Sequence, residues 1–129
     1  MSAWYTELQR FIDGCVEEGR EQPQSALEEF WSLICKAPPE YALLFENSIT
    51  AGRLDQLCAA DAYLSAAVEM VGPYCGILVT RAATGSSSAV VSISGEAKEG
   101  EFFGYDPTVA LLAACAHAML TLGSTPPRH

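Results

Sequence analysis

The chain has 129 residues, of which 50% are hydrophobic and 18% charged, with five cysteines and a formal net charge of −9. This size and composition predict a single globular domain with a buried core, and they exclude a disordered chain. The acidic balance, with a pI near 4.5, argues against direct binding of nucleic acid, because carboxylates repel phosphates.

The first predicted helix runs from Ser2 to about Glu18. Its apolar residues recur at helical spacing and form a single stripe: Trp4, Leu8, Phe11, Ile12, Cys15 and Val16. The acidic residues Glu17 and Glu18 lie away from this stripe, and Gly19 and Pro23 are expected to close the helix.

Three further helices are predicted before residue 74. The second begins at Ser25, whose spacing to Glu28 fits a capping box. A shorter helix is expected from Glu40 to about Asn47, and a long fourth helix from about Ala51 to Val71. The apolar stripe of the fourth helix consists of Leu54, Leu57, Cys58, Leu64, Val68 and Val71.

From Cys75 the pattern changes to that of a sheet. The segments Cys75–Ala82 and Ala89–Ser94 are predicted to form a β-hairpin, and the sequence leaves open whether Glu101–Tyr105 adds a third strand. Asp106 as cap and Pro107 in the first turn then begin a last helix. Because this helix has almost no polar face, we expect it to pack on several sides.

These elements predict an α+β fold in a single domain of residues 1–129. It would consist of about four N-terminal helices, a small antiparallel sheet of two or three strands, and a buried C-terminal helix. The acidic helical part covers residues 1–74, and the hairpin with the last helix covers residues 75–129.

Residues 51–123 follow the order helix, hairpin, short strand, helix. Within them, the stretch Gly100–Thr108 is followed by spaced alanines at positions 110, 113, 114 and 118. This part resembles the end of a double-stranded-RNA-binding domain, and it also resembles the small helix-sheet-helix proteins of phages known as the ABA-sandwich type. The resemblance implies a topology for this part of the chain.

RNA binding does not follow from this resemblance. The RNA-binding family places lysines in the first turn of the last helix, where they contact phosphate across the groove. This chain has no lysine there, and the corresponding residues are Thr108, Val109, Ala110 and Leu111.

The cysteines and histidines suggest no catalytic or metal site. The cysteines form no C-x-x-C pair and lie among apolar neighbours, so buried and reduced thiols are expected: Cys15, Cys35, Cys58, Cys75 and Cys115. Cys115 and His117 are two residues apart, and on a helix this separates their directions by about 200°. With no nucleophile or phosphate-loop motif present either, we expect no catalytic residue, metal or cofactor.

The charges are distributed unevenly. Residues 1–74 carry twelve acids and four bases, a net of −8, whereas residues 75–129 carry four acids and three bases, a net of −1. A folded domain does not need this split, which therefore favours a basic partner. Solvated helix faces are the alternative explanation, and they are the default for the acid pairs Glu17-Glu18, Glu28-Glu29 and Asp55 with Asp61.

Six residues are predicted to bind a partner protein. Five are carboxylates of the first and fourth helices, and the sixth is a tyrosine beside Trp4, where an exposed aromatic residue among acids is typical of an interface anchor. The six residues are Tyr5, Glu17, Glu18, Asp55, Asp61 and Glu69.

The sequence thus favours a small acidic inhibitor that is not an enzyme. It would dock on a basic, nucleic-acid-binding surface of its partner, in the manner of phage anti-CRISPR and anti-restriction proteins, with carboxylates in place of phosphates. One alternative is an immunity or chaperone-like partner of a basic toxin or effector. Another is a small enzyme or ligand-binding domain whose site the sequence does not reveal.

The expected location is the cytoplasm of a bacterium or of a phage-infected host. The start Ser2-Ala3-Trp4-Tyr5 lacks the basic region of a signal peptide. The most apolar run, Val109 to Leu122, is shorter than the roughly 18 residues that a membrane span needs. The sequence does not decide whether the chain forms a homodimer.

Overall fold

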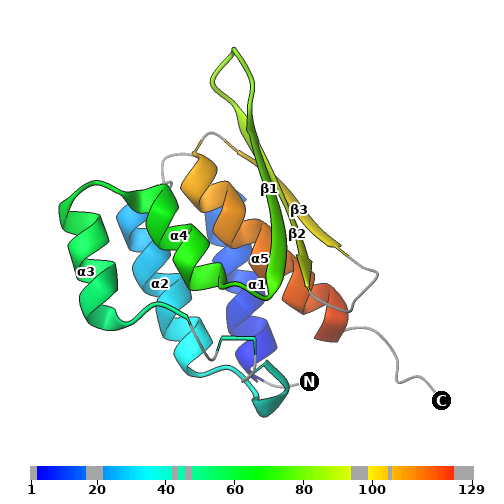
Figure 1. Cartoon of the computed structure of the whole chain (residues 1–129). Helices are drawn as coiled ribbons and strands as arrows, with labels where there is room; N and C mark the ends of the chain where they lie inside the picture. The colour runs from blue at the N-terminus through cyan, green and yellow to red at the C-terminus, as the bar shows by residue number, and fades with distance from the viewer. Residues whose placement is uncertain are drawn as a thin grey trace.

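The computed structural model describes residues 3–16, 22–41, 44–45, 48–93, 99–104 and 106–123. Four helices precede a three-stranded antiparallel sheet and a last helix that packs against both (Figure 1). The elements are α1 (Ala3–Val16), α2 (Pro23–Cys35), the 3-10 helix η1 (Pro39–Tyr41), α3 (Ala51–Ala59), α4 (Tyr63–Val71), β1 (Cys75–Arg81), β2 (Ser87–Ile93), β3 (Glu99–Gly104) and α5 (Pro107–Gly123). The predicted α+β fold is confirmed.

Helix α5 is the centre of the fold. Asp106 caps it, because its Oδ1 accepts hydrogen bonds from the backbone N–H groups of Thr108 at 2.8 Å and Val109 at 3.1 Å. Residues 108–116 are all buried, and α5 contacts the sheet as well as α1, α2 and α4. The prediction of a last helix packed on several sides is therefore confirmed, as Figure 1 shows.

The sheet has the order β1-β2-β3, so Glu99–Gly104 does form a third strand. A tight turn joins β1 to β2: the Ala82 N–H donates to the Ser86 carbonyl at 2.8 Å, and the Gly85 N–H donates to the Ala82 carbonyl at 2.9 Å. Gly85 has φ 97°, a conformation that glycine adopts at little cost. This combination is a type I turn followed by a glycine bulge, which suits a β-hairpin.

The two faces of the sheet differ in burial. Residues directly opposite one another share a face, so the buried Ala89, Val91 and Ile93 mark the side that packs on α5. On the opposite side, Leu78 of β1 remains 61% exposed and Phe103 of β3 75% exposed. Within the described residues, this outer face is thus left to solvent.

Two helix boundaries of the N-terminal half differ from prediction. Helix α2 begins at Pro23, not at Ser25, and Gln22 occupies the cap position without a side-chain hydrogen bond. Pro23 begins the helix because its fixed φ suits a first helical residue and its missing N–H is not needed there. The short helix expected from Glu40 is the 3-10 turn Pro39–Tyr41, and residues 42–43 and 46–47 lie outside the described residues.

The predicted fourth helix is in fact two helices. The Asp61 N–H donates to the Cys58 carbonyl at 3.0 Å, and the Ala62 N–H donates to the Leu57 carbonyl at 2.8 Å. With Asp61 at φ 56°, these bonds form a Schellman motif that ends α3. The motif usually has glycine at this position, which would mark the end of the helix in the sequence. Here an aspartate adopts the left-handed conformation instead, so the sequence shows no break.

Candidate protein-binding surface

Carboxylates exceed bases in the helical layer. Among the described residues between positions 3 and 74 there are eight acids and three bases. Two of the three bases are engaged, since Lys36 Nζ lies 3.1 Å from Glu7 Oε1 and Arg53 Nη2 lies 3.0 Å from Glu69 Oε2. These pairs leave six acids with a single remaining base, Arg10, so the excess negative charge persists after pairing.

Three exposed carboxylates of α2, α3 and the turn after α3 lie in the neighbourhood of Cys58. Burial raises the pKa of the Cys58 thiol, and the nearby charges of Glu28 and Asp55 raise it further. Asp61 belongs to the same neighbourhood: the Tyr63 hydroxyl donates to its Oδ1 at 3.0 Å, which raises the pKa of Tyr63, and Cys58 adds to that effect. We call Glu28, Asp55 and Asp61, all exposed, the α2–α3 acidic surface.

Two of these three residues, Asp55 and Asp61, were predicted to bind a partner. Glu28 was not among the predicted residues, and it comes from a different helix. Nothing in the sequence places Glu28 of α2 near Cys58 of α3, because residues on separate helices come together only through packing. Glu17 and Glu18 lie outside the described residues.

Glu69 lies elsewhere and is occupied. Arg53 Nε donates to Glu69 Oε1 at 3.2 Å and Arg53 Nη2 donates to Oε2 at 3.0 Å, a two-point contact between α3 and α4. The hydrogen bond from the guanidinium lowers the pKa of Glu69 below its usual value. Glu69 therefore does not extend the α2–α3 acidic surface as a free carboxylate.

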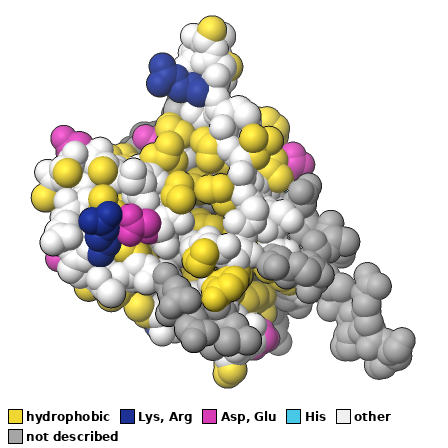
Figure 2. Space-filling model, in the orientation of Figure 1, with side chains coloured by type: hydrophobic (Ala, Val, Ile, Leu, Met, Phe, Trp, Pro, Cys, Tyr) yellow, Lys and Arg dark blue, Asp and Glu magenta, His cyan; other side chains and the backbone are white. Residues whose placement is uncertain are grey.

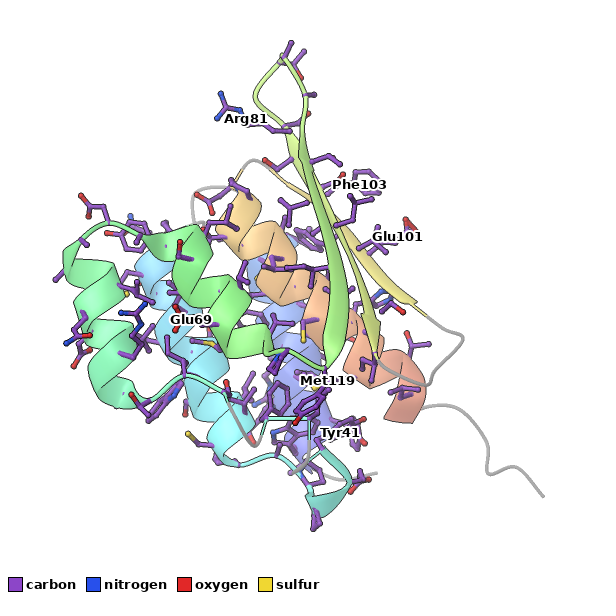
Figure 3. All side chains as sticks on the ribbon, viewed as in Figure 1. Tyr41, Glu69, Arg81, Glu101, Phe103 and Met119 are labelled. Carbon is purple, nitrogen blue, oxygen red and sulfur yellow. The ribbon has the colours of Figure 1, made fainter. Side chains whose placement is uncertain are left out.

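Tyr5 is half-buried in an aromatic cluster. Its ring packs edge-on against Trp4, with ring centroids 5.2 Å apart, and its hydroxyl lies 3.1 Å from that of Tyr41. Tyr41 donates to the Met119 carbonyl at 3.0 Å, and burial raises its pKa (Figure 3). Tyr5 thus helps to join α1 to η1 and α5, and less of it is exposed than its position in the sequence suggested.

A groove of about 480 Å³ opens beside α3 and α4. Its hydroxyl groups already have structural partners. Ser48 Oγ donates to the Met70 carbonyl at 2.7 Å, and Thr50 Oγ1 caps α3 by accepting from the Arg53 N–H at 3.2 Å. The solvent-exposed lining of the groove is mainly apolar, and it also includes the Arg53–Glu69 ion pair. It is lined by Ser48, Ile49, Thr50, Arg53, Val68, Glu69, Gly72 and Pro73.

All five cysteines have free thiols, but their surroundings differ. Cys35 is exposed at the end of α2, so its predicted burial was wrong: its position on the last turn lies beyond the core. Cys75 and Cys115 are hydrogen-bonded to one another, which raises the pKa of the buried Cys115. No signal in the sequence connected these two residues, which are forty positions apart. Cys115 and His117 are separated as expected, since Cys115 is buried and His117 exposed.

Comparisons with known proteins identify no relative of this chain. No protein-family model matches the chain, and neither curated proteins nor solved structures give a significant match. Among the described residues, no group of three or more histidine, cysteine, aspartate or glutamate side chains is placed to hold a metal ion. Within the same residues, every helix is too short or too polar to span a bilayer.

Proposed function

We propose that this protein binds a partner protein through the α2–α3 acidic surface and so covers a basic, nucleic-acid-binding site of that partner. The observation that carries the proposal is the excess of eight acids over three bases among the described residues between positions 3 and 74, with Glu28 and Asp55 exposed on α2 and α3. Carboxylates spaced over a rigid helical surface present negative charge much as a phosphate backbone does. Such a surface steers a basic partner toward it and increases the association rate.

The distribution of the bases supports the same surface. Lys36 and Arg53 pair with Glu7 and Glu69, which lie outside the surface. On the face of the molecule drawn in Figure 2, acidic side chains lie mostly toward the outline, and hydrophobic side chains occupy the middle.

A charge-reversal experiment tests the proposal. The protein is immobilised, proteins captured from a cell lysate are identified by mass spectrometry, and a captured nucleic-acid-binding protein is purified for direct affinity measurement. The variant Glu28→Lys with Asp55→Lys should weaken this binding by at least about tenfold, which is about 1.4 kcal/mol. An oligonucleotide ligand of the partner should compete with the wild-type protein.

The matched control is Asp13→Lys with Glu101→Lys. These carboxylates are exposed on α1 and β3, and the control changes the net charge by the same amount. It should bind like the wild type. Equal weakening by both double variants would show that only net charge matters, and simultaneous binding of protein and oligonucleotide would contradict occupation of the nucleic-acid site. A captured basic toxin that binds no nucleic acid would instead favour an immunity function.

A further inference from the structure

The two edges of the sheet are protected unequally. Strand β3 at one edge carries the exposed Glu101, and a charged residue at an edge discourages pairing with another chain. Strand β1 at the other edge pairs with β2 in unbroken register from Cys75 to Arg81. It contains no acid, no proline and no bulge, and its one charged residue, Arg81, lies at the hairpin end (Figure 3).

Exposed apolar side chains gather around this unprotected edge. Seven large hydrophobic residues are exposed among the described residues, and five of them lie on β1 or on the helix and turn that lead into it: Leu64, Val68, Tyr74, Ile77 and Leu78. Figure 2 shows hydrophobic side chains over the region where Figure 1 draws α4 and the sheet. An apolar edge strand without acidic residues, proline or a bulge is a template for strand addition.

The pairing with β2 fixes which backbone groups of β1 point outward. The Ala82 N–H donates to Ser86, so this pair is hydrogen-bonded. Hydrogen-bonded and non-hydrogen-bonded pairs alternate along an antiparallel ladder. Thr80, Leu78 and Gly76 therefore bond to β2. The N–H and C=O groups that point away from β2 belong to Cys75, Ile77, Val79 and Arg81.

We propose that β1 pairs antiparallel with β1 of a second copy of this chain, so that two three-stranded sheets join into one of six strands. A two-fold axis at Leu78 uses all seven residues of the strand. It places Leu78 opposite Leu78 of the second copy and Ile77 opposite Val79. The outward-pointing groups of Ile77 and Val79 then face each other, as a hydrogen-bonded pair requires.

The residues of β1 are complementary to themselves in this register. Leucine meets leucine and isoleucine meets valine, which are favourable cross-strand pairs. Arg81 lies opposite Cys75 of the second copy, so no like charges meet within the paired strands. The segment from residue 75 onward has a net charge of only −1, so two copies approach here with less repulsion than through their helical layers.

The number of hydrogen bonds is adequate for an interface. The register contains four hydrogen-bonded residue pairs, each with two N–H···O bonds, or roughly eight in all. A typical protein interface has about ten. The match of β1 with itself favours a second copy of the chain over an unrelated peptide as the partner. A peptide could pair with β1 without any requirement that the residues of β1 be complementary to one another.

Molar mass in solution tests the dimer. Light scattering on the wild-type protein should give twice 13.8 kDa. Leu78→Lys should give the monomer mass, because the register sets two lysines against each other at the axis. Leu78→Glu should do the same for two carboxylates. Mixing the two variants should restore the dimer, since opposite charges then meet.

Phe103→Lys is the matched control. Phe103 is 75% exposed on the outer face of β3, so the same kind of change is made away from β1, and this variant should remain a dimer. If Phe103→Lys dissociates the dimer as well, the copies stack through the outer face and the edge pairing is wrong. A wild-type protein that stays monomeric up to about 100 μM would also overturn the proposal.

A second measurement on the wild type covers the case in which the Leu78 variants fail to fold. Amide hydrogen exchange is followed at low and high protein concentration. The N–H groups of Ile77 and Val79 should exchange more slowly at high concentration, and those of the β3 edge should not change. Concentration-independent exchange at Ile77 and Val79 would contradict the pairing.

Discussion

At the scale of single residues, Asp61 shows how one backbone conformation divides a helical segment. Its φ of 56° lies in the left-handed region, which costs a side chain with a Cβ about 1–2 kcal/mol. Asp61 is one of the few residue types that tolerate this conformation. The two hydrogen bonds of the Schellman motif then turn the chain from α3 into α4.

We predict that Asp61→Gly is more stable than Asp61→Val by about 1–2 kcal/mol, because glycine adopts a positive φ freely and a β-branched residue does not. Both variants lose the carboxylate and its bond to the Tyr63 hydroxyl, so the comparison isolates the backbone. Urea unfolding gives the two free energies. At Asp55, in the regular part of α3, the order should reverse, since valine is the better helix former. Equal stability of the two Asp61 variants would contradict the assigned conformation.

At the scale of elements, the contact between β3 and α5 depends on small residues. Gly100 is buried, and a Cβ added there would overlap the Ala114 carbonyl oxygen and the Ala118 backbone nitrogen. The strand can therefore approach the helix only because Gly100 has no side chain and the facing residues of α5 are alanines. This close approach helps to bury α5 against the sheet.

We expect Gly100→Ala to reduce the free energy of unfolding by about 2–3 kcal/mol, as overpacking against backbone does. Gly76→Ala is the control within the same sheet. Its added Cβ would lie 3.8 Å from Ser92 Cβ, an ordinary contact, so its effect should be much smaller. Thermal unfolding of the two variants provides the comparison, and similar losses for both would contradict the close packing of β3 on α5.

The Arg53–Glu69 pair joins α3 to α4, and its contribution should depend on pH. The guanidinium lowers the pKa of Glu69 in the folded state, so its stabilising effect is present above the pKa of the unfolded chain. The effect is lost as the pH falls through the lowered pKa. Because both side chains are largely exposed, salt should weaken the pair.

A double-mutant cycle with Arg53→Gln and Glu69→Gln measures this coupling. The coupling free energy should be favourable at neutral pH, smaller at high salt, and absent once Glu69 is protonated. A coupling that does not change between neutral and acid pH would show that the contact is not an ion pair in solution.

At the scale of the whole molecule, the net negative charge is concentrated in the helical layer, and the exposed apolar surface lies mainly around the sheet. If the acidic layer steers a basic partner, salt should slow association much more than it changes dissociation. The reason is that ions screen charges beyond a Debye length of about 10 Å at 0.1 M. Association and dissociation rates measured between about 0.05 and 0.5 M salt provide the test. Rates that do not depend on salt would mean that the acidic layer contributes only to solubility.

The sequence by itself predicted the parts of this fold that depend on local patterns. The Asp106 cap and Pro107 located the start of α5, and the absence of a polar face predicted its burial from several sides. The apolar segments on either side of the turn Thr84-Gly85-Ser86-Ser87 predicted the hairpin. These features depend on neighbours along the chain, such as a cap or a turn between two apolar segments, so they can be recognised without knowing the fold.

The tertiary structure alone decided which distant residues meet. The division at Asp61 is set by backbone hydrogen bonds to carbonyls three and five residues earlier, with no glycine or proline to mark it. Glu28 of α2 lies near Cys58 of α3, and Arg53 pairs with Glu69, because α2 and α3 both pack against α4. Apolar periodicity shows which face of a helix is buried, but it carries no information about which helix lies beside it. For that reason the charge excess was visible in the sequence, and the surface that it forms was not.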